Sequence, residues 1–353
     1  MKYLYIPLLL LTFSLNSLGQ RLEKGKEYNV VCVGFYNLEN LFDTLVDPDT
    51  SKILQEDFTP HGPKAWNTEK YNKKLEKMAT AISKIGTNVN PDGPAVLGVS
   101  EIENRQVLED LVKMPQLASR NYKIIHYESP DRRGIDVALL YQEKYFTYKS
   151  SATFNVKLEG DPDYRTRNQL LVTGEIDGEE FHFMVVHWPS RRGGEFKSRP
   201  KRVAAAETGK AVIDSILKVN PKAKLIYMGD LNDDPNNVSL TKGMKSQGDI
   251  NLMKKKSMYN PAEKLWKDGI GTLAYKHSWN LFDQMLCTNG LVETGSDFST
   301  FKYYKMTVFN EPFLKQQEGQ FKGCPLRTYS FGQWINGYSD HFPVFLTLVK
   351  EKK

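Results

Sequence analysis

Runs of apolar residues along the chain predict short strands separated by amphipathic helices. Buried strands are expected at residues 28–36, 95–99, 122–127, 135–141, 169–176, 181–186, 225–228 and 281–287. Helical spacing of apolar residues instead covers 66–85, 104–114 and about 201–219. Several strands follow one another across tight turns, which favours an α/β fold with mixed sheets packed as a sandwich over strict strand–helix alternation.

The remaining segments suggest one catalytic domain over residues 21–353. A polar stretch at 43–63, broken by prolines and Gly62, reads as a long loop, and 243–321 is less regular. We find no internal repeat, no low-complexity linker and no domain boundary after residue 21. We expect this domain to be a monomer.

The first twenty residues differ from the rest. A positive start at Lys2, an apolar run from Tyr5 to Phe13 and a small-residue exit near Gly19 are typical of a secretory signal peptide. We therefore expect residues 1–20 to be removed and the protein to be secreted or periplasmic. A retained membrane anchor is the alternative, but the run is short for a span of about 20 residues.

Net charge and cysteine content give limited information about binding partners and disulfide bonds. The net charge of +6 over 353 residues is a mild excess, but six of the basic residues fall within 191–202. This run suits a polyanionic partner, or it is a solvated loop that enters a helix. The three cysteines, Cys32, Cys287 and Cys324, form no CxxC pair. Cys32 and Cys287 are expected to be buried free thiols, although one disulfide is possible.

Polar residues that can do chemistry follow several predicted strands at the point where each ends. They are Asn37, Glu101, His187, Asp230, Asn232, Asp283, Asp340 and His341. Carboxylate and amide oxygens suit Mg²⁺, with Mn²⁺ or Ca²⁺ as alternatives. Histidines beside such a metal can stabilise charge on a phosphoryl group, and a carboxylate can accept a proton from the attacking water. The pattern therefore indicates a metal-assisted hydrolase.

The ordered set of these motifs resembles the endonuclease/exonuclease/phosphatase superfamily, which contains DNase I-like nucleases. The matching segments run in chain order: Phe35-Tyr36-Asn37-Leu38-Glu39-Asn40, Gly98-Val99-Ser100-Glu101-Ile102, Gly134-Ile135-Asp136-Val137-Ala138, Val186-His187-Trp188, Gly229-Asp230-Leu231-Asn232, Phe282-Asp283-Gln284 and Ser339-Asp340-His341. The resemblance implies a four-layer α/β sandwich, two packed mixed sheets flanked by helices. It also implies that the site residues converge at one edge of that sandwich.

The resemblance also implies a role for each site residue. Asn37, Glu101 and Asp340 correspond to the metal site, and Asp230 to the carboxylate that activates water. Asn232 corresponds to the amide that positions water and phosphate, His187 and His341 to phosphate contacts, and Asp283 to the carboxylate that orients a histidine. Arg133, Arg167 and Arg191 are expected to contact substrate phosphate.

The leading interpretation is an exported nuclease that cleaves DNA or RNA by in-line attack of water. Inositol phosphates or sphingomyelin are alternative substrates, since the same superfamily cleaves them. A non-catalytic binding module is a further alternative, as is a serine hydrolase that uses Ser100, whose segment lacks the second glycine of G-x-S-x-G. Aromatic residues at 303–304, 329, 331 and 334 either contact substrate or pack in the core.

Four other polar residues are assigned structural roles. Asp233 and Asp234 are expected to be solvated turn carboxylates, and Glu39 to be a turn residue beside the metal site. His182 is out of phase with His187 on the same strand, so it should face the opposite side of the sheet.

Overall fold

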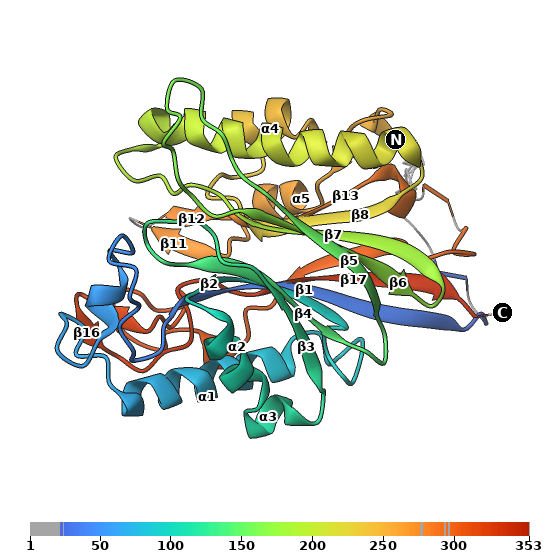
Figure 1. The fold of residues 1–353 in the computed structure, drawn as a ribbon. Coiled ribbons are helices and arrows are strands. Elements are labelled where there is room, and N and C mark those ends of the chain that lie inside the picture. Colours follow the sequence, from blue (N-terminus) through green and yellow to red (C-terminus); the bar gives the residue numbers. More distant parts are fainter. Residues whose placement is uncertain (1–21, 24, 276–277, 293, 296, 353) are drawn as a thin grey trace, which may run out of the picture.

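The computed structural model describes residues 22–23, 25–275, 278–292, 294–295 and 297–352 (Figure 1). The predicted signal peptide lies outside the described residues. Among those that are described, no helix combines the length and the apolar character needed to cross a bilayer.

The first of two large sheets has six strands in the order β14-β17-β1-β2-β4-β3. Their bounds are β1 Tyr28–Leu41, β2 Val96–Ile102, β3 Tyr122–His126, β4 Asp136–Gln142, β14 Lys302–Val308 and β17 Val344–Glu351. Strands β1 and β2 pair in parallel, and the other pairs are antiparallel. The carboxyl ends of β1 and β2, which carry Asn37 and Glu101, therefore lie side by side.

The second sheet has seven strands in the order β5-β6-β7-β8-β13-β10-β9. Their bounds are β5 Thr147–Phe154, β6 Gln169–Ile176, β7 Glu179–His187, β8 Lys224–Asp230, β9 Ser246–Gln247, β10 Met258–Tyr259 and β13 Asp283–Cys287. Two small hairpins lie apart from the large sheets: β11 Leu273–Tyr275 with β12 Ser278–Asn280, and β15 Tyr329–Ser330 with β16 Gln333–Trp334.

The two sheets pack face to face, with helices on both outer sides, so the expected four-layer α/β sandwich is confirmed (Figure 1). Helices α4 Glu195–Val219 and α5 Ala262–Lys267 cover the seven-stranded sheet. Helices α1 Thr68–Lys84, α2 Arg105–Val112 and α3 Pro115–Ala118 cover the six-stranded sheet. The α1 helix begins where the Asn67 side chain accepts the Lys70 backbone N–H at 3.0 Å, an N-cap that satisfies an otherwise unpaired donor.

Two glycines permit close approach where the sheets and strands meet near the site. A Cβ on Gly98 would lie 3.2 Å from both the Met228 sulfur and a Phe35 ring carbon, between the two sheets. A Cβ on Gly229 would lie 2.0 Å from the Val186 carbonyl oxygen of the neighbouring strand. The glycine before Asp230 therefore lets β8 pack against β7 without steric clash.

Three local expectations differ from the structure. Strand β5 was not expected, because it is an exposed edge strand with few apolar residues. Strand β14 was hidden in the irregular region 243–321. Helix α4 begins at Glu195 instead of about 201 and runs through Pro200. Ser198 Oγ donates to the Gly194 carbonyl at 2.7 Å and Arg202 donates to the Glu195 carbonyl at 3.1 Å, so side chains bond carbonyls of this first turn.

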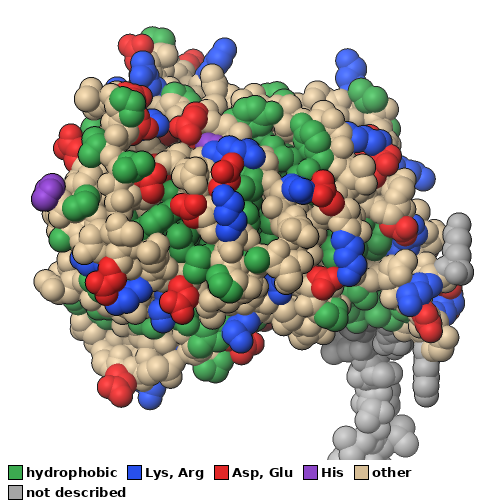
Figure 2. All heavy atoms as spheres, turned by 60° about the horizontal axis from the view of Figure 1, so that its bottom comes forward, with side chains coloured by type: hydrophobic (Ala, Val, Ile, Leu, Met, Phe, Trp, Pro, Cys, Tyr) green, Lys and Arg blue, Asp and Glu red, His purple; other side chains and the backbone are tan. Residues whose placement is uncertain are grey.

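The cysteine prediction holds: Cys32 and Cys287 are free and buried, and Cys324 is free and half-buried. On the face turned forward in Figure 2, basic, acidic and hydrophobic side chains are interspersed. No area of a single charge dominates that face.

Candidate active site

Asp230 is the centre of the cluster that the strand ends bring together. In the seven-stranded sheet it pairs in register with His187 on one side and with Asp283 on the other. Its Oδ2 accepts a hydrogen bond from Asn37 Nδ2 at 3.1 Å, across the gap between the two sheets. Residues nearly two hundred positions apart thus meet at a single carboxylate.

Burial controls the acidity of this carboxylate. It raises the pKa of Asp230 to about 7, against the attraction of the His341 charge and with added repulsion from Asp283. The backbone N–H of Asn232 donates to Asp230 Oδ1 at 2.9 Å and fixes the orientation of the carboxylate. Burial therefore makes the Asp230 carboxylate a stronger proton acceptor than an exposed aspartate.

His341 is held as a cation. Its Nδ1 lies 2.7 Å from Asp283 Oδ2, and its Nε2 lies 3.8 Å from Asp230 Oδ2. Burial alone would lower the pKa of His341, but the charges of Asp283 and Asp230 outweigh burial and raise it well above the ordinary value. A protonated imidazole here is a positive hydrogen-bond donor aimed at the site.

The pKa of His187 is shifted in the direction opposite to that of His341. Its Nε2 lies 3.5 Å from Asp230 Oδ2 and 3.8 Å from Glu101 Oε1, while its buried Nδ1 has no hydrogen-bond partner among the described residues. Burial lowers the pKa of His187 well below its ordinary value, and the charge of Arg167 adds to the effect. The site thus pairs a neutral imidazole with a charged one.

Glu101 and Asp340 complete the rim of the cluster. Glu101 Oε2 accepts the Asn40 backbone N–H at 3.1 Å, and Arg133 lies 3.4 Å from Glu101 Oε1. Asp340 Oδ1 is 3.9 Å from His341 Nε2, and its Oδ2 accepts a hydrogen bond from Arg327 at 2.9 Å. All eight predicted site residues therefore lie in one connected cluster at one edge of the sandwich.

Backbone strain concentrates in the same place. Glu39, Asn40, Glu101 and Asn232 all have positive φ, between 47° and 59°. Residues other than glycine seldom adopt this conformation, and such outliers cluster at sites where geometry matters more than stability. These four outliers support the choice of this edge of the sheets as the candidate site, independently of any motif.

The donor set fits a hard divalent cation. Carboxylates from Glu101 and Asp340 and the amide of Asn37 offer oxygen atoms, and no thiol is among them. Asn37 Oδ1 also accepts the Glu39 backbone N–H at 2.9 Å, which fixes the amide with its Nδ2 toward Asp230. A buried carboxylate oxygen of Asp283 has no hydrogen-bond partner among the described residues, so the cluster carries excess acceptor capacity.

Two of the arginines expected at substrate phosphate are used inside the protein instead. Arg167 is buried, donates to the His187 and Trp188 carbonyls at 3.1 and 2.5 Å, and forms an ion pair with Asp131 at 3.0 Å. Arg191 contacts Asp233 and Asp234, each at 3.2 Å. Both guanidinium groups fix the loops around the site, and only Arg133 of the three is placed at the rim of the metal-side carboxylates.

The expectation that Asp233 and Asp234 are solvated is wrong. The Asp233 side chain is fully buried and lies 2.7 Å from the guanidinium of Arg202, which is also fully buried. Asp234 accepts the Leu281 backbone N–H at 2.9 Å. Buried carboxylates need opposite charges, and the basic run at 191–202 supplies them.

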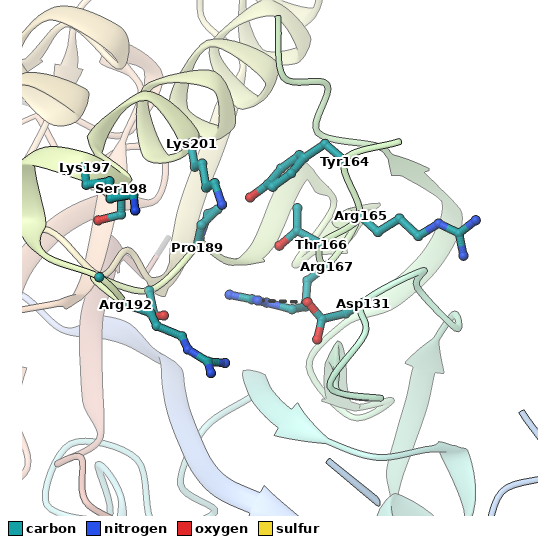
Figure 3. Close-up of a pocket in the computed structure, with 12 residues that line it drawn as sticks. Asp131, Tyr164, Arg165, Thr166, Arg167, Pro189, Arg192, Lys197, Ser198 and Lys201 are labelled. Carbon is teal, nitrogen blue, oxygen red and sulfur yellow. Dashed lines mark hydrogen bonds and ion pairs between the residues drawn. The ribbon is translucent and has the colours of Figure 1, made fainter. Parts of the chain in front are cut away.

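Part of the basic run stays free and lines a cleft of about 390 Å³ beside the site (Figure 3). Strand β7 ends at His187, and the segment that follows it contributes Pro189 and Ser190 to the wall of the cleft. Lys201 points across the cleft toward Tyr164, 5.4 Å from the ring centre. No carboxylate of the described residues lies within ion-pair distance of the cleft's cations Arg165, Arg192, Lys197 and Lys201.

Sequence reasoning missed three residues that the structure places around the site. Asp131 holds Arg167, Arg327 holds Asp340, and Lys74 is buried 4.0 Å from Glu39. None lies in a motif, so only the tertiary contacts reveal them. The Ser100 hydroxyl, by contrast, is buried with no hydrogen-bond partner among the described residues, which removes the base that a nucleophilic serine needs.

The sequence from residue 32 to residue 350 matches the Endonuclease/Exonuclease/phosphatase family. The chain belongs to this family, and the superfamily resemblance is confirmed. It is accordingly a phosphoric ester hydrolase from a family that depends on divalent metals. No curated protein matches the sequence at a significant level.

Solved structures show the same fold at low sequence identity. Truncated TDP2 from Caenorhabditis elegans is 17% identical, with a TM-score of 0.51, over 90% of this chain and 97% of that chain. A family protein from Bacteroides thetaiotaomicron is 16% identical, with a TM-score of 0.52, over 92% and 100%. TDP2 from D. rerio, complexed with a single-strand DNA product, is 14% identical, with a TM-score of 0.52, over 90% and 98%. These identities support the fold alone.

Proposed function

We propose that this protein is an exported, divalent-metal-dependent nuclease that hydrolyses phosphodiester bonds of DNA or RNA. The observation that carries the proposal is the convergence of two histidines and an amide on the single buried carboxylate of Asp230. The catalytic unit is a single domain over residues 21–353, acting as a monomer.

Asp230 is the general base in this proposal. It accepts a proton from the attacking water, while the N–H of Asn232 keeps its carboxylate in place. The Asn232 side chain donates to the Trp188 carbonyl at 2.9 Å, which ties the loop after β8 to the loop after β7. The segment after the base is therefore held against the backbone next to His187.

The two histidines stabilise the phosphoryl group from different sides. His341 carries a positive charge, and its Nε2 is the donor that a developing negative oxygen requires. Burial, with the charges of Arg167, Arg133 and His341, disfavours a proton on His187, so in this proposal it donates as a neutral imidazole. Asp283 holds the His341 ring by its other nitrogen and so positions the donor.

A divalent cation, Mg²⁺ or Mn²⁺ with Ca²⁺ as a further candidate, would be held by Glu101, Asp340 and the Asn37 oxygen. When bound, it would neutralise the charge of the phosphoryl oxygens during hydrolysis. The chain's own part is to keep these oxygens together, and the Arg327 contact to Asp340 and the Asn40 contact to Glu101 do so.

Nucleic acid is the favoured substrate because of the basic cleft beside His187. Its unpaired cations would attract the phosphates that flank the scissile bond. The D. rerio structure with a single-strand DNA product is consistent with such a substrate on this fold. Secretion or export to the periplasm rests on the sequence of residues 1–20.

An assay on the purified protein tests the proposal. Plasmid DNA, RNA, sphingomyelin and an inositol phosphate are each incubated with Mg²⁺ and with excess EDTA. We expect cleavage of DNA or RNA that EDTA abolishes, and calorimetry should show weaker Mg²⁺ binding by Glu101→Gln. Cleavage in EDTA would contradict the metal site, and hydrolysis of sphingomyelin or inositol phosphate alone would overturn the nuclease assignment in favour of that substrate.

A further inference from the structure

An exposed aromatic residue stands next to the proposed metal side. Phe331 is 82% exposed, the second most exposed large hydrophobic side chain of the described residues after Val219. It occupies the first position of the two-residue turn between β15 and β16, with φ of 48° at Phe331 and 78° at Gly332. Asn or Gly normally fills that position, because a bulky side chain is disfavoured at positive φ.

Aromatic packing holds the hairpin that carries this ring. Tyr329 and Trp334 pair across the strands with ring centres 5.4 Å apart, and Trp334 lies 5.6 Å from the buried Trp66. The Tyr329 hydroxyl donates to the Lys64 carbonyl at 3.0 Å. Two of the three aromatic residues of the segment are thus packing residues, and they fix the position of the third.

Phe331 lines two clefts, and Asp340 of the candidate site lines both of them. One has a volume of about 260 Å³ and also contains Glu39, Asn40 and Lys64. The other has about 150 Å³ and contains Phe321, whose ring centre is 5.8 Å from that of Phe331. Arg327 also lines both clefts, so the ring shares each cleft with the carboxylate next to His341.

We propose that the Phe331 ring is a stacking platform for a nucleobase adjacent to the scissile phosphate. This inference rests on the proposed nuclease function and deepens it, since it assigns a single-stranded or locally unpaired polynucleotide as the substrate. Every base presents a flat π-face, so stacking on an aromatic ring binds a strand without selecting its sequence.

The surroundings favour a base over a lipid chain. The walls beside Phe331 carry Arg327, Asp340, Glu39 and Lys64, which are charged groups that an acyl chain would leave unsolvated. A nucleotide instead offers a flat ring to Phe331 and phosphate and sugar oxygens to Lys64. The platform and the basic cleft would bind different parts of one strand, one by its bases and the other by its phosphates.

The test uses Phe331→Asn, because asparagine suits the turn and removes the ring without unfolding the hairpin. Phe196→Ala is the matched control, since Phe196 is 80% exposed on α4 and contacts Arg199. Kinetics are measured on single-stranded oligonucleotides that carry one abasic site at successive positions. Wild type should lose roughly tenfold in kcat/KM at one abasic position next to the cleaved bond. Phe331→Asn should show the same roughly tenfold lower kcat/KM on the strand without an abasic site. An abasic site at the sensitive position should cause no further loss in this variant. Phe196→Ala should behave as wild type.

The outcomes separate the two proposals. If wild type cleaves no oligonucleotide, the nuclease function fails and the platform fails with it. If wild type cleaves but Phe331→Asn matches it on every substrate, the nuclease function stands and the platform is overturned. Loss of binding to phosphatidylcholine–sphingomyelin vesicles, with unchanged cleavage of oligonucleotides, would show that Phe331 contacts membranes and would also overturn the platform.

Discussion

The Nδ1 atom of His341 lies 2.7 Å from the Oδ2 atom of Asp283, and both side chains are almost fully buried. Asp283 begins β13, and His341 comes from the segment that precedes β17, so the contact joins the two sheets. The pair fixes which imidazole nitrogen faces Asp230 and keeps the ring protonated.

Replacing Asp283 with Asn should leave the fold intact and reduce kcat on the order of 10²-fold, with a small change in KM. Without the negative charge, the pKa of His341 falls, so the alkaline limb of the activity profile should move to lower pH. Steady-state kinetics across pH 5–10 measures both effects. An unchanged alkaline limb would show that the His341 charge plays no part in catalysis.

The free cations of the cleft should act on substrate capture. Lys197→Gln with Lys201→Gln should raise KM for nucleic acid and flatten its dependence on salt, with kcat nearly unchanged. Arg199→Gln is the matched control, because Arg199 is neutralised by Glu195 at 2.9 Å. Equal salt slopes for the double variant and the wild type would remove the cleft from substrate binding.

The buried ion pair of Arg202 and Asp233 should matter for stability. Arg202→Met keeps most of the side-chain volume but removes the closer of the two arginines that pair with the buried Asp233 carboxylate. The free energy of unfolding should therefore fall by about 3 kcal/mol. Arg199→Met removes a solvent-exposed pair with Glu195 on the same helix and should cost far less stability, because solvent screens that pair. Urea denaturation of both variants checks the contrast. Equal losses of unfolding free energy in the two variants would mean that burial of the Arg202–Asp233 pair does not add to stability.

His182 should make stability depend on pH. Its Nδ1 lies 2.8 Å from Thr173 Oγ1, and burial lowers the pKa of His182, with Glu180 opposing that effect. The unfolded chain therefore binds the proton more tightly than the folded protein. The His182 contribution is complete above the unfolded pKa of about 6.5 and declines as pH falls through the lower folded value. Thermal melts from pH 5 to 8 should show a flatter profile for His182→Gln, and parallel profiles would contradict this assignment.

Local sequence patterns were sufficient to predict the strands that lead to the site. Strands β1, β2, β7 and β8 are buried on both faces, so each appears as a continuous apolar run with a polar residue at its end. The order of those end residues along the chain then indicated the family, and with it the sandwich. The edge strand β5 lacks such a run because solvent covers it, so no local pattern could reveal it.

The sequence did not reveal which charged residues form ion pairs, because the tertiary structure determines those partners. Asp233 and Asp234 look like an exposed acidic turn, and residues 191–202 look like a solvated basic loop. The fold buries the acidic turn and the Arg202 side chain of the basic run, so Arg191 and Arg202 neutralise the turn, while Lys197 and Lys201 line the cleft. Likewise, only the tertiary structure shows that Tyr329 and Trp334 pack against each other while Phe331 is exposed. Partners across long sequence separations are set by how the elements pack, and that information is absent from any single segment.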